Sequence, residues 1–216
     1  MRLGCVVVLA AVVMVAMATG SLWVGSRILQ EPVVDPSPGT AEDGVRGQQK
    51  IYDIARGVPG RTKGRPRQVS LTEPELNAFL SRHLTEAARI PVVTGGVRLV
   101  GDGIIEFKGQ LPLRQVLTSL LFVPVVDLIP GAWLERSVWL HLGARASLEV
   151  GAARGQRRYL RLDVERFALG RQPLPEMLLR LLLGPETMRL FRWHMPEAVE
   201  AITIEPGMVV IRTAAS

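Results

Sequence analysis

The chain has 216 residues, a single cysteine and a formal net charge of +6. This length accommodates one domain together with an anchor and a linker, and a single cysteine excludes both a disulfide framework and a Cys/His metal cluster. The basic residues are nearly all arginines and no nucleic-acid motif accompanies them, so we expect no nucleic-acid partner; the charge indicates either a solvated surface or an attraction to anionic lipid headgroups.

The first apolar run predicts a membrane anchor. Gly4 to Val24 carries no charge and spans about 20 residues, the length that crosses a bilayer core. Trp23 stands where interfacial aromatic residues are common. Ala16-Met17-Ala18 fits a signal-peptide cleavage pattern, but the apolar run continues past it, which favours an uncleaved signal anchor. We expect residues 1–28 to form a single-pass anchor in the cytoplasmic (inner) membrane, with the folded part on the extracytoplasmic side.

Residues 29–68 have the composition of a flexible linker. Pro32 to Gly44 is rich in proline, glycine and small polar residues, which favour an extended and mobile chain. Gln48 to Arg56 has the pattern of a short helix. The basic run from Arg56 to Gln68 is either a solvated linker or a segment that touches lipid headgroups.

Ser70 to Arg89 predicts an amphipathic helix. Thr72 and Glu75 have the spacing of a capping box, in which each side chain accepts a hydrogen bond from a free backbone N–H of the first turn. The apolar stripe recurs at helical spacing and consists of Leu76, Phe79, Leu80, His83, Leu84 and Ala87. We interpret His83 as a core or boundary residue, because a lone histidine beside such a stripe is rarely a ligand.

Two antiparallel hairpins are predicted next. Val97 to Leu111 reads as two short strands around a Gly-Asp-Gly turn. Val138 to Val150 alternates strictly between apolar and polar residues, and Tyr159 to Gly170 returns with a change of phase that predicts a β-bulge. At ~3.3 Å per residue the strand from Val138 is roughly 40 Å long. One amphipathic helix is too short to cover its apolar face, so other elements or a ligand must cover the remainder.

The C-terminal third predicts a further helical region and a last hairpin. Gln172 to Pro196 is the helical region, and Val199 to Arg212 forms the hairpin around Pro206-Gly207. The stripe of the helical region is either core or an opening for lipid, and it consists of Met177, Leu178, Leu181 and Leu182.

The run from Leu117 to Leu134, LTSLLFVPVVDLIPGAWL, is nearly all apolar. A second membrane span is excluded, because its uncharged part is too short and because Pro124, Asp127 and Pro130 are costly in hydrocarbon. A core helix and an element that lines or caps an apolar groove, in contact with the bilayer, both fit the pattern.

Several motifs occur in a familiar order. They are the helix opening SLTEPELNAFL with its Asn77, the Gly-Asp-Gly hairpin, the long hairpin, ALGRQPLP and MPEAVEAITIEPGMVVI. In this order they resemble the YpmS-like family of membrane-anchored extracytoplasmic bacterial proteins, which is similar to the tubular lipid-binding (TULIP-like) superfamily. The resemblance covers roughly Val69 to Ile211. It implies lipid binding or lipid handling at the envelope and identifies no catalytic residue. Asn77 is its most distinctive match, and we expect this side chain to be structural and to hydrogen-bond a neighbouring backbone.

The expected fold is therefore α+β. An N-terminal transmembrane helix and linker precede a TULIP-like domain over residues 69–213, in which a long curled antiparallel β-sheet wraps around the amphipathic helix, with additional helices.

Three classes of function compete for this sequence. The first is a non-catalytic lipid-binding module of the bacterial envelope with membrane lipids as partners, and the second is an assembly partner that docks an envelope protein complex through the same apolar surface. An enzyme is not expected, because no catalytic, P-loop or zinc motif occurs; we expect no cofactor and no metal. The predicted groove-lining residues are Leu76, Phe79, Leu80, Leu84, Leu120, Leu121, Phe122, Leu140 and Leu142.

Overall fold

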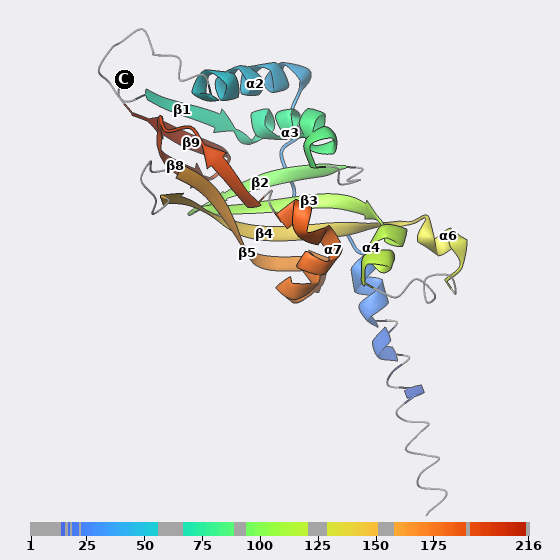
Figure 1. The fold of residues 1–216 in the computed structure, drawn as a ribbon. Coiled ribbons are helices and arrows are strands. Elements are labelled where there is room, and N and C mark those ends of the chain that lie inside the picture. Colours follow the sequence, from blue (N-terminus) through green and yellow to red (C-terminus); the bar gives the residue numbers. More distant parts are fainter. Residues whose placement is uncertain are drawn as a thin grey trace, which may run out of the picture.

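The structure is a computed structural model that describes residues 14–15, 17, 19–21, 23–55, 67–88, 94–120, 129–150, 158–188 and 191–214. It confirms an α+β fold with a large antiparallel sheet and several helices (Figure 1). Two sheets are present in place of the one continuous sheet that we expected. A three-stranded sheet has the order β1-β9-β8, and a six-stranded sheet has the order β2-β3-β4-β5-β6, with β7 also paired to β5.

The small sheet is formed by segments far apart in the sequence. Its strands are β1 (Arg67–Thr72), β8 (Val199–Glu205) and β9 (Met208–Thr213). The last two form the predicted hairpin around Pro206-Gly207, which the strand register confirms. The helices α2 (Ala41–Ala55) and α3 (Glu73–Ala88) lie beside this sheet at one end of the molecule (Figure 1).

The large sheet contains both hairpins that were predicted before residue 171, the short one around the Gly-Asp-Gly turn and the long one that follows it. Its strands are β2 (Gly95–Gly101), β3 (Ile104–Pro112), β4 (Ser137–Val150), β5 (Arg158–Leu169), β6 (Gln172–Pro173) and β7 (Arg192–Met195). The predicted bulge is confirmed: Gly143 pairs with Arg166 and Ala144 with Val164, so Glu165 is the extra residue. The prediction of a helix over the whole of Gln172 to Pro196 is wrong at both ends, because Gln172–Pro173 form β6 and Arg192–Met195 form β7, which pairs with residues 158–161 of β5.

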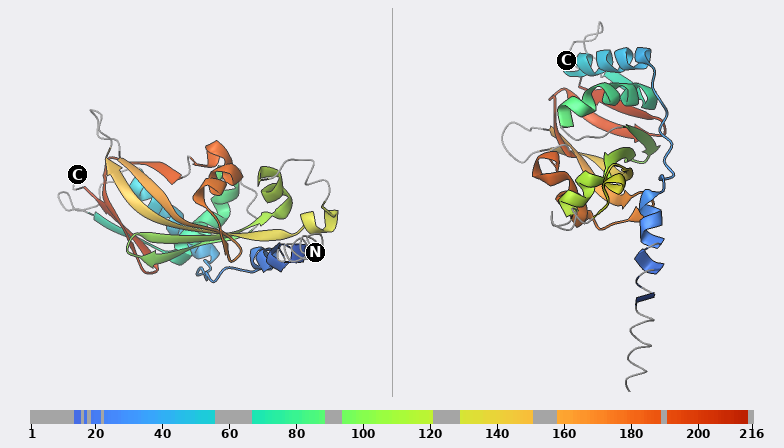
Figure 2. Two further views of the ribbon diagram at one scale, coloured as in Figure 1. Left: turned by 90° about the horizontal axis from the view of Figure 1, so that it is seen from below. Right: turned by 90° about the vertical axis from the view of Figure 1, so that its right-hand side faces the viewer.

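A hydrophobic core lies at one end of the large sheet. The helices α4 (Leu113–Leu120) and α7 (Glu176–Met188) pack there, with α6 (Gly131–Leu134) beside α4. In Figure 2 (left) α4 and α7 lie on one side of the sheet and the N-terminal helix on the other. We call this cluster the α4/α7 core; its buried members are Leu111, Val116, Val138, Leu140, Leu142, Phe167, Leu169, Leu179 and Leu182.

The predicted linker is packed against the domain over much of its length. Residues 31–40, which we call the strap, form neither helix nor strand, and Val34 is only 3% exposed. Lys108 of β3 donates hydrogen bonds to Glu31 Oε1 (2.7 Å) and to the carbonyl of Val34 (2.8 Å). The helix α2 then begins at Ala41, earlier than the predicted short helix. The expectation of an extended and mobile chain over Pro32 to Gly44 is wrong at its end, where residues 41–44 are helical, and composition does not reveal the partners that hold the strap.

Just before the strap, the backbone of residues 27–30 is in close contact with the β5–β6 turn. Arg171 N donates a hydrogen bond to the carbonyl of Arg27 (2.8 Å). Gly170 has a positive φ of 57°, and a Cβ at this position would collide with the carbonyl oxygens of Arg27, Ile28 and Gln30. Only glycine fits there, so the end of the N-terminal helix is held against the large sheet.

Among the residues that the structure describes, no helix is long and apolar enough to cross a membrane. Much of the predicted anchor, including residues 1–13, lies outside the described residues. So does the middle of the Leu117 to Leu134 run, residues 121–128; its two ends form the last part of α4 and all of α6.

Candidate apolar ligand cavity

A cavity of about 440 Å³ lies between the two sheets, on the part of the large sheet away from the α4/α7 core. The helices α2 and α3, both sheets and β7 enclose it. Its lining residues are Ile51, Ile54, Ala55, Leu71, Leu76, Phe79, Leu80, Val97, Ile105, Ala146, Leu160, Leu162, Trp193, His194, Met195, Pro196, Val199, Ile202, Ile204, Val209 and Ile211. A volume between ~300 and 1,000 Å³ is usual for small-molecule sites.

The structure brings together three of the predicted groove residues and separates the others. Leu76, Phe79 and Leu80 line the cavity from the apolar stripe of α3. Leu140 and Leu142 lie in the α4/α7 core instead, where they are 2% and 7% exposed. They share the apolar face of β4 with Ala146, which does line the cavity, but they lie further toward its α4/α7 end.

The remaining predicted residues cannot be placed in either region. Leu121 and Phe122 lie outside the described residues, and for Leu84 and Leu120 the structure describes the helical backbone but not the side chain.

Several lining residues were not predicted as site residues. Ile51 and Ile54 come from α2, which the sequence placed in a flexible linker, and Trp193 comes from β7, which the sequence placed in a helix. Leu160 and Leu162 come from the returning strand β5, for which the sequence predicts a strand but no cavity. Alternation along β5 is the sequence signal that places Leu160 and Leu162 on one face. Leu160 pairs with Trp193 of β7, and both residues line the cavity.

The lining is almost free of ionisable groups. Among the described lining residues His194 is the single ionisable side chain, and none is acidic, lysine or arginine. The rings of His194 and Tyr159 meet edge-on at 5.6 Å. Because burying an unpaired charge costs several kcal/mol, this cavity suits an apolar group. Trp193 is 43% exposed, so the cavity reaches the surface along β7, where the polar end of an amphiphile has access to water.

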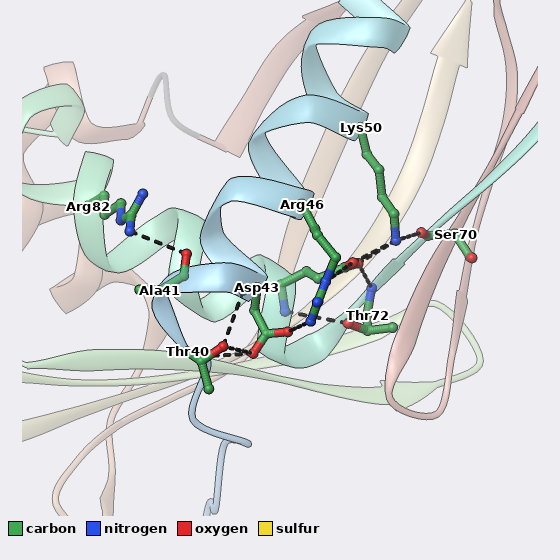
Figure 3. A network of polar contacts seen from close by, with 9 residues as sticks. Thr40, Ala41, Asp43, Arg46, Lys50, Ser70, Thr72 and Arg82 are labelled. Atoms are coloured by element: carbon green, nitrogen blue, oxygen red, sulfur yellow. Dashed lines mark hydrogen bonds and ion pairs between the residues drawn. The ribbon is translucent and has the colours of Figure 1, made fainter.

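The helix α2 forms one wall of the cavity, and several polar contacts hold it in place (Figure 3). Lys50 donates hydrogen bonds to both carboxylate oxygens of Glu75 (2.7 Å each) and to the carbonyl of Ser70 (2.9 Å). Arg46 pairs with Asp43, which in turn accepts hydrogen bonds from Thr40 at the start of the helix. These contacts fix the rotation of α2 that points Ile51 and Ile54 into the cavity.

Glu75 joins this clamp to the start of α3. Its carboxylate accepts a hydrogen bond from Thr72 N (2.9 Å), and Glu75 N lies 3.5 Å from Thr72 Oγ1, so the predicted capping box is confirmed. Burial tends to raise the pKa of Glu75, but hydrogen bonds from Lys50 and Thr72 outweigh it and hold the pKa below its ordinary value. The group is therefore a carboxylate at neutral pH.

A second set of contacts fixes the strap to α3 and β2. Glu73 accepts hydrogen bonds from Ser37 N (2.7 Å) and Leu99 N (2.8 Å). One turn later, Asn77 donates to the carbonyls of Ser37 (2.9 Å) and Val97 (2.8 Å) and accepts from Val97 N (2.6 Å). Both side chains are buried. The expectation that Asn77 hydrogen-bonds a backbone is confirmed, although its partners are remote in sequence.

The opposite face of the large sheet carries a buried histidine. His141 is 9% exposed, and its Nε2 lies 3.8 Å from Glu106 Oε1. Burial lowers the pKa of His141, and Arg166 lowers it further, against the attraction of Glu106. No group of three metal-ligating side chains is found in the described part of the chain. We assign no chemistry to this face.

No protein-family model matches the chain, and no curated protein or solved structure matches it either. The function proposed below therefore rests on the residues themselves.

Proposed function

We propose that this chain is a membrane-anchored, non-catalytic module that binds one apolar chain of a lipid in the cavity between its two sheets. The observation that carries the proposal is a cavity of about 440 Å³ with an almost wholly apolar lining. The resemblance to the TULIP-like superfamily agrees with this use.

The energetics favour an acyl or similar hydrocarbon chain as the bound group. Each methylene group transferred from water into an apolar site contributes ~0.8 kcal/mol. A tail of about ten buried methylenes therefore contributes enough gross free energy to offset the loss of translational and rotational freedom on binding. A charged headgroup finds no counter-charge among the described lining residues, so it stays at the mouth near Trp193.

The location that we propose is the extracytoplasmic side of the cytoplasmic membrane. It rests on the uncharged run from Gly4 to Val24, which has the length of a membrane span. An envelope protein partner is the alternative use of the same apolar lining.

A binding titration with a matched pair of variants tests the proposal. Ala146→Phe places a ring in the cavity, whereas Ser147→Phe places the same ring on the opposite face of the same strand. We expect the full chain and Ser147→Phe to bind a fluorescent fatty acid that unlabelled phospholipid displaces, and Ala146→Phe to lose most of this binding. Equal binding by all three proteins, or by none, would contradict the proposal.

A further inference from the structure

We propose that the end of the domain formed by α4, α6 and α7 contacts the surface of the lipid bilayer. This inference rests on the anchoring part of the proposed function but not on the cavity. In Figure 1 these three helices gather beside the N-terminal helix. Three large apolar side chains at this end are exposed: Trp133 (50%), Met177 (74%) and Leu181 (54%).

The helix α7 is apolar on two opposite sides. Leu179 and Leu182 are buried in the α4/α7 core. Met177 and Leu181 are four residues apart, so they share one face of the helix, and that face is exposed. A surface helix of a water-soluble domain normally presents polar residues on its outer face. The outer face of α7 therefore indicates a second apolar neighbour.

The path of the chain identifies that neighbour as lipid. Ile28 packs against the α4/α7 core, and Arg171 N holds the carbonyl of Arg27. The uncharged run of Gly4 to Val24 thus joins the domain at this end and not at the α2 end. With that run in the bilayer, α4, α6 and α7 are the part of the domain nearest to the headgroups.

The polar residues of this end suit a membrane interface. The Arg136 guanidinium lies 5.0 Å from the ring centre of Trp133, as the Arg27 guanidinium lies 4.7 Å from that of Trp23. Tryptophan and arginine are typical of the headgroup region. Arg180 is exposed but also pairs with Glu176 at 3.2 Å. The contact is therefore mainly apolar, and anionic lipid should strengthen it only modestly.

Site-specific labelling of the full chain tests this contact. The single cysteine is removed by Cys5→Ser, and one new cysteine at a time carries an environment-sensitive fluorophore in Leu181→Cys, Met177→Cys, Tyr52→Cys or Val15→Cys. Each of these positions is more than half exposed, so the changes should cost little stability. The proteins are inserted into vesicles of phosphatidylcholine and phosphatidylglycerol, with and without brominated acyl chains as the quencher.

The labels at 181 and 177 should be quenched several-fold more by brominated lipid than the label at 52, which lies on α2 at the other end of the domain. The label at 15 reports on the anchor. If the label at 15 is quenched and the labels at 181 and 177 are not, this inference is overturned, but the proposed anchoring is not. Labels at 181 and 177 that are shielded from aqueous iodide but not quenched by lipid also overturn it, in favour of a protein neighbour. An unquenched label at 15 overturns both this inference and the proposed anchoring, while cavity binding is measured separately.

Discussion

The side-chain amide of Asn77 pairs with the peptide group of Val97 as a neighbouring strand would. It accepts a hydrogen bond from Val97 N at 2.6 Å and donates one to Val97 O at 2.8 Å. The same amide group also donates to the carbonyl of Ser37 in the strap. One buried side chain therefore joins α3, β2 and the strap, and it positions the cavity-lining face of α3 against the large sheet.

Replacing Asn77 with alanine should destabilise the domain by about 3 kcal/mol, because the two buried peptide groups of Val97 and the partly buried carbonyl of Ser37 lose their partners. Urea denaturation of the full chain measures this loss. The matched control is Ser81→Ala, one turn later on α3, where the hydroxyl bonds only to a carbonyl of its own helix and the cost should be within about 0.5 kcal/mol. Equal stabilities of the two variants would show that the Asn77 contacts are not important for folding.

The clamp between Lys50 and Glu75 should make stability depend on pH. Because the folded-state pKa of Glu75 lies below its ordinary value of 4.5, the stabilisation is present above that value. It is lost as the pH falls through the folded-state pKa, since the unfolded chain takes up the proton first. We expect the free energy of unfolding to decrease below about pH 4.5, and Glu75→Gln to make this decrease smaller. Parallel pH profiles for the two proteins would contradict the assignment.

His141 should give a separate dependence at higher pH. Its pKa in the folded protein lies below the ordinary 6.5, so protonation favours the unfolded chain as the pH falls below that value. Replacement by glutamine should remove the loss of stability that begins near this pH. If His141→Gln and the parent chain lose stability equally between neutral pH and the window of Glu75, the buried imidazole is not responsible.

The close approach of α2 to α3 should make Gly47 intolerant of a side chain. A Cβ on this residue would lie 2.8 Å from the backbone oxygen of Glu75, so alanine must displace α2 although alanine favours helices by ~1 kcal/mol. We expect Gly47→Ala to speed hydrogen exchange of the α2 amides. Gln49→Ala, on the exposed side of the same helix, should leave exchange unchanged or slow it. Similar exchange in both variants would mean that α2 is not closely packed.

Much of the fold could be predicted from the sequence because its signals are local. Capping at Thr72, alternation along β4 and the change of phase near Phe167 each depend on neighbours within a few residues. The docking of the strap could not be predicted, because it depends on Glu73 and Asn77 meeting Ser37 some 36 and 40 residues away.

The candidate site could be predicted from the sequence only in part, for a related reason. The apolar stripe of α3 predicts Leu76, Phe79 and Leu80 correctly as lining residues. Alternation, however, cannot tell which part of a long strand face packs against a core and which part lines a cavity. Alternation places Leu140 and Ala146 on the same apolar face and cannot separate them, although only Ala146 lines the cavity.

Binding should depend on the length of the hydrocarbon chain and little on its charge. Each added methylene that enters the cavity contributes ~0.8 kcal/mol, or about fourfold in affinity, until the cavity is full. Fatty acids and fatty alcohols of equal length should bind similarly, since no charged side chain is found among the described lining residues. Displacement titrations over a series of chain lengths measure both trends. A strong preference for the carboxylate would reveal a cationic partner at the mouth.

Mass spectrometry of the lipids that copurify with the full chain tests the central claim most directly. The parent chain, Ala146→Phe and Ser147→Phe are purified in the same detergent and extracted under identical conditions. The cavity account predicts about one lipid or fatty acid per molecule for the parent chain and for Ser147→Phe, and much less for Ala146→Phe. Equal lipid content in the three folded proteins, or none in the parent chain, would contradict it.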